Sequence, residues 1–153
     1  MNHRRRTTLG ALFAAVLGPL LGRRVRAALP AGEPDPTAFQ QRSVAAALQR
    51  LGLGELADSA AIDLDVPDIA ENGAVVPVAV RSRIPGTDAI LVLLEKNPFP
   101  LAAFYDVADG IAPGFSMRVK MAETADVIAV VRAGSRCFQT RREVKVTIGG
   151  CGG

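Results

Sequence analysis

The sequence predicts an all-β protein: an immunoglobulin-like antiparallel β-sandwich with one N-terminal helix and a flexible C-terminal arm. Short apolar segments that alternate with polar residues recur from Ile62 onward, and β-branched residues are frequent in them. Clusters of Gly, Pro, Asn and Asp separate these segments at regular spacing, which is typical of sandwiches. Helical periodicity is confined to a stretch between residues 36 and 51.

Residues 1–27 are predicted to be an export signal. They contain six arginines and no acid, and Arg4 to Arg6 precede an apolar stretch from Leu9 to Leu21. This stretch is shorter than the ~20 residues that a membrane span needs. Val25-Arg26-Ala27 places small residues at the −3 and −1 positions of a cleavage site. The paired arginines indicate a twin-arginine signal peptide, an ordinary secretory signal being the alternative, and both predict a periplasmic protein.

Removal of this segment changes the charge and the available chemistry. The whole chain carries 18 basic and 15 acidic residues, so the loss of six arginines leaves a net charge of −3. The basic pI therefore belongs to the signal, and nucleic-acid binding loses its electrostatic support. The chain's one histidine, His3, leaves as well, which excludes a Ser-His-Asp triad, a Cys-His pair and a histidine-ligated metal site. No cofactor motif is present.

One helix is predicted from Pro36 to Leu51. Asp35 is its expected N-cap, Pro36 suits its first position, and Gly52 is its expected C-cap. The apolar stripe of this helix is narrow. It predicts packing against the body of the domain or across a subunit interface, and the sequence does not choose between them.

Short strands and turns are predicted for the rest of a single domain, residues 28–148. Glu71-Asn72-Gly73 and Pro85-Gly86-Thr87-Asp88 are the expected turns, and Pro77 favours an edge strand or a bulge. Ser135–Phe138 is expected to join the last hairpin. The predicted strands are Ile62–Val66, Val75–Arg83, Ala89–Glu95, Leu101–Val107, Phe115–Met121, Asp126–Arg132 and Arg142–Ile148.

The C-terminal pentapeptide, residues 149–153, is the candidate functional site. Cys151 is flanked by Gly149 and Gly150 on one side and by Gly152 and Gly153 on the other, directly after the alternating run from Glu143 to Ile148. Glycines leave the backbone free and put no side chains beside the thiol. The pattern predicts a slender arm that enters a pocket on another protein. With no base or cation beside it, Cys151 is suited to carrying a load rather than to catalysis.

Several segments resemble one known family. The terminal run Val144–Gly153 is similar to the C-terminus of the SoxY family, the sulfur-substrate carrier subunits of periplasmic thiosulfate-oxidising (Sox) systems. The segments Pro67–Val78, Asn97–Pro100 and Arg118–Met121 also have counterparts there, in the same order. The resemblance covers nearly all of the mature chain.

This resemblance implies a carrier that performs no chemistry alone. Thiosulfate-derived intermediates would be held covalently on Cys151 during oxidation of reduced sulfur to sulfate. The implied partners are a SoxZ-like subunit in a heterodimer, the c-type cytochrome SoxAX, which conjugates thiosulfate to Cys151, and the di-manganese hydrolase SoxB, which releases sulfate. A sulfur dehydrogenase is a further implied partner.

Two other functions remain open on the residues. An exported structural or interaction β-sandwich could be linked through a disulfide at Cys151, since the compartment permits disulfides. Ubiquitin-like sulfur carriers also end in Gly-Gly, although the export signal and the all-β pattern disfavour them. Cys137 departs from the family pattern of one terminal cysteine. It is expected either to be a small buried residue of a strand or to bond Cys151 or a partner.

Overall fold

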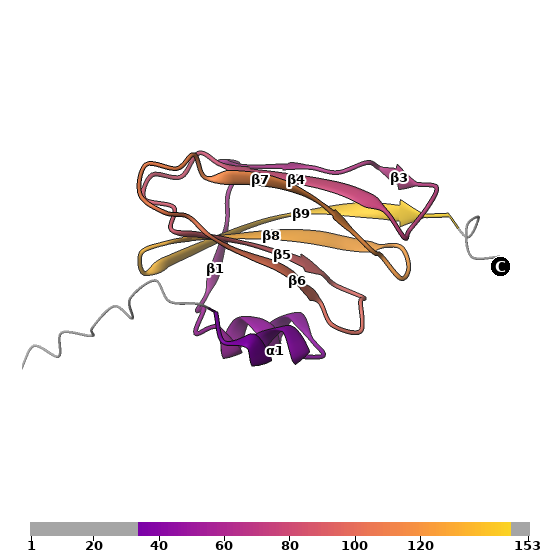
Figure 1. Cartoon of the computed structure of the whole chain (residues 1–153), viewed down its shortest axis with the longest axis horizontal. Helices are drawn as coiled ribbons and strands as arrows, with labels where there is room; N and C mark the ends of the chain where they lie inside the picture. The colour runs from indigo at the N-terminus through magenta and orange to yellow at the C-terminus, as the bar shows by residue number, and fades with distance from the viewer. Residues whose placement is uncertain (1–33, 148–153) are drawn as a thin grey trace, which may run out of the picture.

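Two β-sheets and a helical layer form the three layers of the protein (Figure 1). The computed structural model describes residues 34–147. The predicted signal (residues 1–27) and carrier arm (residues 149–153) lie outside the described residues. The elements are the 3₁₀ helix η1 (Pro36–Gln40), α1 (Val44–Arg50), β1 (Leu56–Asp58), β2 (Ile62–Asp65), β3 (Ile69–Ala70), β4 (Val76–Ser82), β5 (Ala89–Leu94), β6 (Leu101–Asp106), β7 (Gly114–Val119), β8 (Ala125–Ala133) and β9 (Arg136–Val146).

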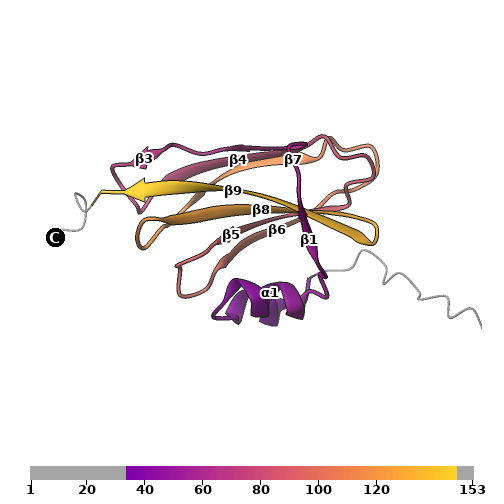
Figure 2. The same cartoon turned by 180° about the vertical axis from the view of Figure 1, so that it is seen from behind.

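The predicted β-sandwich is confirmed. The larger sheet has the strand order β1-β9-β8-β5-β6, with β3 also paired to β9, and the smaller sheet has the order β2-β4-β7. Most pairs are antiparallel, while β1 and β3 pair with β9 in parallel. Figure 2 shows the same layers from behind, with β9 running most of the length of the sandwich.

Two apolar cores explain the burial pattern of the strands. One core lies between the sheets and the other lies between the larger sheet and the helices. Every residue of β5 is buried, because one face of this strand packs in each core. In β4 the buried residues alternate with more exposed ones, because its outer face meets solvent. Each fully buried Val, Leu or Ile side chain contributes about 1.5–3 kcal/mol.

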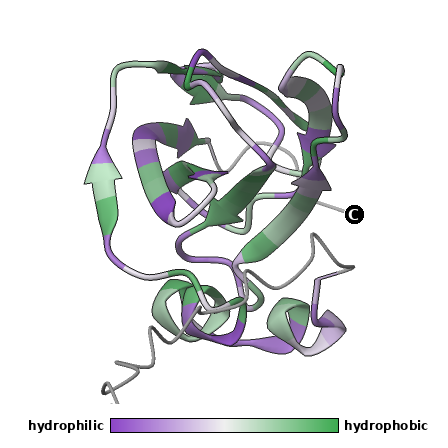
Figure 3. Cartoon of the chain, turned by 90° about the vertical axis from the view of Figure 1, so that its left-hand side faces the viewer, coloured by the Kyte–Doolittle hydropathy of each residue, from purple (hydrophilic) through white to green (hydrophobic). Residues whose placement is uncertain are grey.

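The predicted single helix is wrong in one respect, since it is broken into η1 and α1. Asp35 does cap η1 by accepting the Thr37 N–H at 2.9 Å, and Pro36 begins it. Ser43 then starts α1 afresh, because its hydroxyl accepts the Ala46 N–H at 3.2 Å. Both helical segments pack on the larger sheet, the first of the two arrangements that the sequence left open, and Figure 3 shows them below the strands in an end-on view.

The strand predictions are mostly confirmed, with two corrections. The strands predicted around Ser135–Phe138 and Arg142–Ile148 are parts of one strand, β9, which runs from Arg136 to Val146. Ile148 lies outside the described residues. The short strands β1 and β3 were not predicted. Pro77 lies in β4, the middle strand of the smaller sheet, but β2 pairs with β4 only as far as Ala79, so Pro77 borders β7 alone.

Candidate functional site

Hydrogen bonds from other parts of the chain fix the end of β9, shortly before the C-terminal pentapeptide. Pairing with β8 stops at Val144, which lies opposite Ala125. Beyond it, the N–H groups of Lys145 and Thr147 donate to carbonyls of the β3 segment, and the N–H of Val146 donates to the Thr124 hydroxyl. We call these three acceptors, the carbonyls of Asp68 and Ala70 and the hydroxyl of Thr124, the arm clamp. Its hydrogen bonds measure 3.0, 3.1 and 2.9 Å respectively.

Further contacts hold the arm clamp in place. Arg142 of β9 forms an ion pair with Asp68, Nη2 to Oδ1 at 2.8 Å, and both groups are well exposed to solvent. Gly73 lies so close to Val146 that a Cβ there would stand 2.8 Å from Val146 Cγ1. The Gly73 carbonyl accepts the Met121 N–H at 2.7 Å. The last described residues before the pentapeptide are therefore mounted on a rigid end of the sandwich.

The β5–β6 turn belongs to the same end of the sandwich. The Asn97 side chain donates to the Lys120 carbonyl at 2.7 Å and accepts the Ala122 N–H at 3.1 Å. These two bonds tie the turn to the β7–β8 loop, which carries Thr124. The loops around the arm clamp are thus linked to one another by hydrogen bonds.

Cys137 lies near the opposite end of β9. It is half-buried, it pairs with Arg132 of β8 and Leu56 of β1, and it packs with the core beneath the helices. Burial raises the pKa of the Cys137 thiol above its ordinary value of 9.0, with a smaller opposing effect from the Gly54 N–H. This residue is the small hydrophobic residue of a strand that the sequence allowed. It is a poor nucleophile, because the thiolate is disfavoured.

A disulfide between Cys137 and Cys151 of one chain is excluded by distance. Cys137 and Thr147 are separated by ten residues of extended strand, which span about 33 Å. The four residues from Thr147 to Cys151 reach back at most about 14 Å in any conformation. A disulfide requires Cα atoms within about 7 Å of each other. The described strand therefore puts Cys137 beyond the reach of the arm of its own chain.

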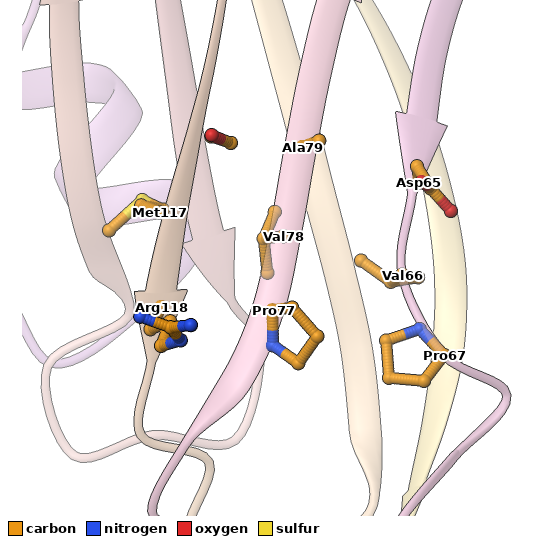
Figure 4. A pocket seen from close by; sticks show the side chains of 9 residues that line it. Asp65, Val66, Pro67, Pro77, Val78, Ala79, Met117 and Arg118 are labelled. Carbon is orange, nitrogen blue, oxygen red and sulfur yellow. The ribbon is translucent and has the colours of Figure 1, made fainter.

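A shallow groove of about 550 Å³ crosses the outer face of the smaller sheet. Figure 4 shows Asp65 and Pro67 on one side of it, Pro77 along the middle, and Arg118 on the other side. The groove contains one carboxylate and one guanidinium, and no cysteine or histidine lines it. With a single carboxylate in its lining, the groove does not have the ligands of a metal site.

Residues 34–147 contain no cluster of three or more histidine, cysteine, aspartate or glutamate side chains able to hold a metal ion. In the same part of the chain, no helix combines the length and the apolar content that crossing a membrane requires.

The site residues predicted from sequence, Cys151 and its four flanking glycines, all lie outside the described residues. The structure adds the arm clamp and the contacts around it, which were not predicted from the sequence. Thr124 lies 22 residues before Val146 in the chain, and no local pattern marks its hydroxyl as an acceptor. Gly73 was noted only as part of a turn, yet its close approach to Val146 explains why glycine stands there.

Comparison with known proteins gives a consistent result. A family model described as "Sulfur oxidation protein SoxY" matches residues 49–151. The solved structure of the sulfur carrier protein SoxY from Chlorobium limicola f thiosulfatophilum is 40% identical in sequence, with a TM-score of 0.62. That match covers 68% of this chain and 94% of the Chlorobium chain.

Other comparisons add little. A superoxide reductase (neelaredoxin) from Ignicoccus hospitalis is 14% identical, with a TM-score of 0.49, over 75% of this chain and 94% of its own. This likeness is too weak to carry an argument about function. A comparison with curated proteins gave no match.

Proposed function

The chain belongs to the SoxY family of sulfur oxidation proteins, and on this basis we propose that it carries sulfur intermediates covalently on Cys151. The single observation that carries this proposal is the position of Cys151. The family match extends to this residue, and β9 is held rigidly up to four residues before it. We expect a thiol mounted in this way to be accessible to partner enzymes, and its neighbours in the sequence are glycines that carry no activating group.

Cys151 is the better candidate of the two thiols in the chain. Cys137 is half-buried in a paired strand, and burial raises its pKa. Its side chain packs against the core beneath the helices, where a growing sulfur chain would have to displace apolar neighbours. The load is therefore assigned to the arm.

The loading step follows from thiol chemistry. The Cys151 thiolate and the outer sulfur of thiosulfate form an S–S bond, and two electrons leave to a c-type cytochrome partner of the SoxAX kind. The product is a cysteine S-thiosulfonate. Hydrolysis by a SoxB-like enzyme then adds water across the terminal S–S bond, releasing sulfate and leaving a persulfide on Cys151. The carrier itself supplies the attachment atom and is not a catalyst.

Export and assembly complete the proposal. Residues 1–27 direct the chain to the periplasm as a twin-arginine signal, residues 28–148 form the β-sandwich domain, and residues 149–153 form the arm. The folded domain pairs with a SoxZ-like subunit in a heterodimer. A sulfur dehydrogenase is a further partner of the persulfide form.

The test compares two matched variants, Cys151→Ser and Cys137→Ser, in partner-catalysed conjugation of thiosulfate. We expect the first variant to take up no sulfur while its fold is unchanged, and the second to be loaded like the wild type. Loading of Cys151→Ser, measured by intact mass, would refute the proposal. Loss of loading in Cys137→Ser with an intact fold would transfer the attachment to Cys137.

A further inference from the structure

The last three described N–H groups of the chain, those of Lys145, Val146 and Thr147, have acceptors that the β8–β9 hairpin does not provide. After Val144, β8 offers no partner, and the chain would be free from Lys145 onward. The arm clamp supplies acceptors from two distant parts of the chain, namely the β3 segment and Thr124 in the β7–β8 loop. The backbone is thereby held by hydrogen bonds as far as Thr147, one residue beyond the end of β9.

The β3 segment provides two of the three acceptors of the arm clamp. It contains two residues, Ile69 and Ala70, and it pairs with Lys145 and Val146 of β9. Ile69 is 58% exposed, so this strand adds little to the core through that side chain. Thr124 is half-buried, and its hydroxyl accepts the one N–H that β3 does not reach, that of Val146.

The arm clamp therefore sets how many residues lie between the last fixed backbone group and Cys151. With the clamp closed, Cys151 is the fourth residue after Thr147, a reach of at most about 14 Å. If the clamp opened, the arm would pivot at Val144, and seven residues would give a reach of about 25 Å. Effective concentration falls roughly as the −3/2 power of tether length, so this change alone lowers it about twofold.

We propose that the arm clamp fixes the pivot of the carrier arm at Thr147, and that Thr124 is a positioning residue for delivery of Cys151 to partner enzymes. This inference rests on the proposed function, because a pivot matters only if the thiol must be delivered to a pocket. Thr124 acts through Val146 and touches neither the load nor the partner's reacting groups.

The experiment compares Thr124→Val, which removes the hydroxyl acceptor, with Thr124→Ser, which keeps it. Thr140→Val is the control, because Thr140 is a half-buried threonine in the middle of β9, opposite Ala129. The first measurement is amide hydrogen exchange at Val146. Loss of one hydrogen bond is expected to speed this exchange about tenfold in Thr124→Val, with little change in Thr124→Ser and Thr140→Val.

The second measurement is partner-catalysed loading of thiosulfate. We expect kcat/KM to fall by up to about twofold in Thr124→Val, mainly through a higher KM, because the arm finds the pocket less often while the chemical step is unchanged. Alkylation of Cys151 by a small uncharged reagent is expected to stay at the wild-type rate. Thr124→Ser is expected to restore loading.

The outcomes separate the two proposals. Equal exchange in Thr124→Val and Thr124→Ser would show that the clamp does not depend on the hydroxyl, and would overturn the inference. Faster exchange with unchanged loading would overturn the positioning role while the carrier function stands. Absence of loading in the wild type would refute the proposed function, whatever the exchange data show.

Discussion

Gly73 lies directly against Val146: a Cβ on residue 73 would stand 2.8 Å from Val146 Cγ1 and 2.7 Å from the Met121 carbonyl oxygen. This close approach lets the loop before β4 close the end of the sandwich beneath the last residues of β9. The same loop accepts the Met121 N–H through the Gly73 carbonyl. The mount of the arm and the end of the core are therefore one packed unit.

The first prediction concerns this contact. Gly73→Ala is expected to destabilise the domain by about 1–3 kcal/mol, because backbone at Met121 must move to admit the methyl group. Thermal unfolding of the purified domain measures the change. Gly54→Ala is the matched control, since a Cβ at Gly54 meets nothing within 4 Å, and it should change stability by no more than about 0.5 kcal/mol. Equal unfolding temperatures for both variants would contradict the packing described for Gly73.

The second prediction concerns the ion pair of Asp88 and Arg132 near the β8–β9 hairpin. Asp88 binds the Arg132 guanidinium, accepts the Gly134 N–H at 2.9 Å, and is two-thirds buried. Asp88→Ala should cost about 2 kcal/mol, because a partly buried cation and a backbone donor lose their acceptor.

The control for this ion pair is Asp63→Ala. Asp63 pairs with Arg83 at 2.9 Å, and both side chains are more than half exposed. Exposed pairs contribute at most about 1 kcal/mol, so this variant should be close to wild type. Urea unfolding of both variants checks the difference. A larger loss of unfolding free energy in Asp63→Ala than in Asp88→Ala would contradict the expectation that the more buried ion pair contributes more.

The third prediction uses the raised pKa of Cys137. In the Cys151→Ser variant, alkylation of Cys137 should show a pH midpoint above that of a cysteine in an unstructured peptide, since burial raises its pKa. The folded protein binds the thiol proton more tightly than the unfolded chain. This contribution to stability is therefore complete below the ordinary thiol pKa of 9.0 and is lost as the pH rises through the folded pKa. A midpoint equal to the peptide's would show that Cys137 is not shielded.

The fourth prediction concerns the cap of η1. The pKa of Asp35 is lowered from its ordinary 3.8, first by the Thr37 hydroxyl and then by the Thr37 N–H. The cap therefore stabilises the fold above this pH and loses its effect as the pH falls through the lower folded value. Thr37→Val should shift the Asp35 titration, followed by NMR, back toward 3.8. An unchanged midpoint would contradict the role of the hydroxyl.

Much of the fold could be predicted from the sequence, because its signals are local. Alternation predicted β2 and β4, the apolar run of β5 predicted a buried strand, and Asp35-Pro36 marked a helix start. The break at Ser43 could not be predicted, since its capping hydroxyl competes with a continuous helical pattern and both are plausible locally.

Other elements depend on contacts between distant residues. Ile69–Ala70 is too short to show any periodicity, and it is a strand only because Lys145 and Val146 lie beside it. The polar run from Gln139 to Glu143 breaks the alternation, yet β9 is continuous there because the apolar strand β8 pairs with it. At the candidate site, the terminal motif predicted Cys151 as the attachment residue. Thr124 could not be found without the fold, because its hydroxyl accepts the N–H of Val146, 22 residues further along the chain.

The most direct test of the central claim is the intact mass of the protein from the periplasm of cells grown on thiosulfate, before and after a reductant, with mapping of the C-terminal peptide. The carrier account predicts additions of one or more sulfurs, or of a thiosulfonate, on Cys151, and their removal by the reductant. An unmodified thiol, or only a disulfide between chains at Cys151, would contradict it and favour an exported structural β-sandwich.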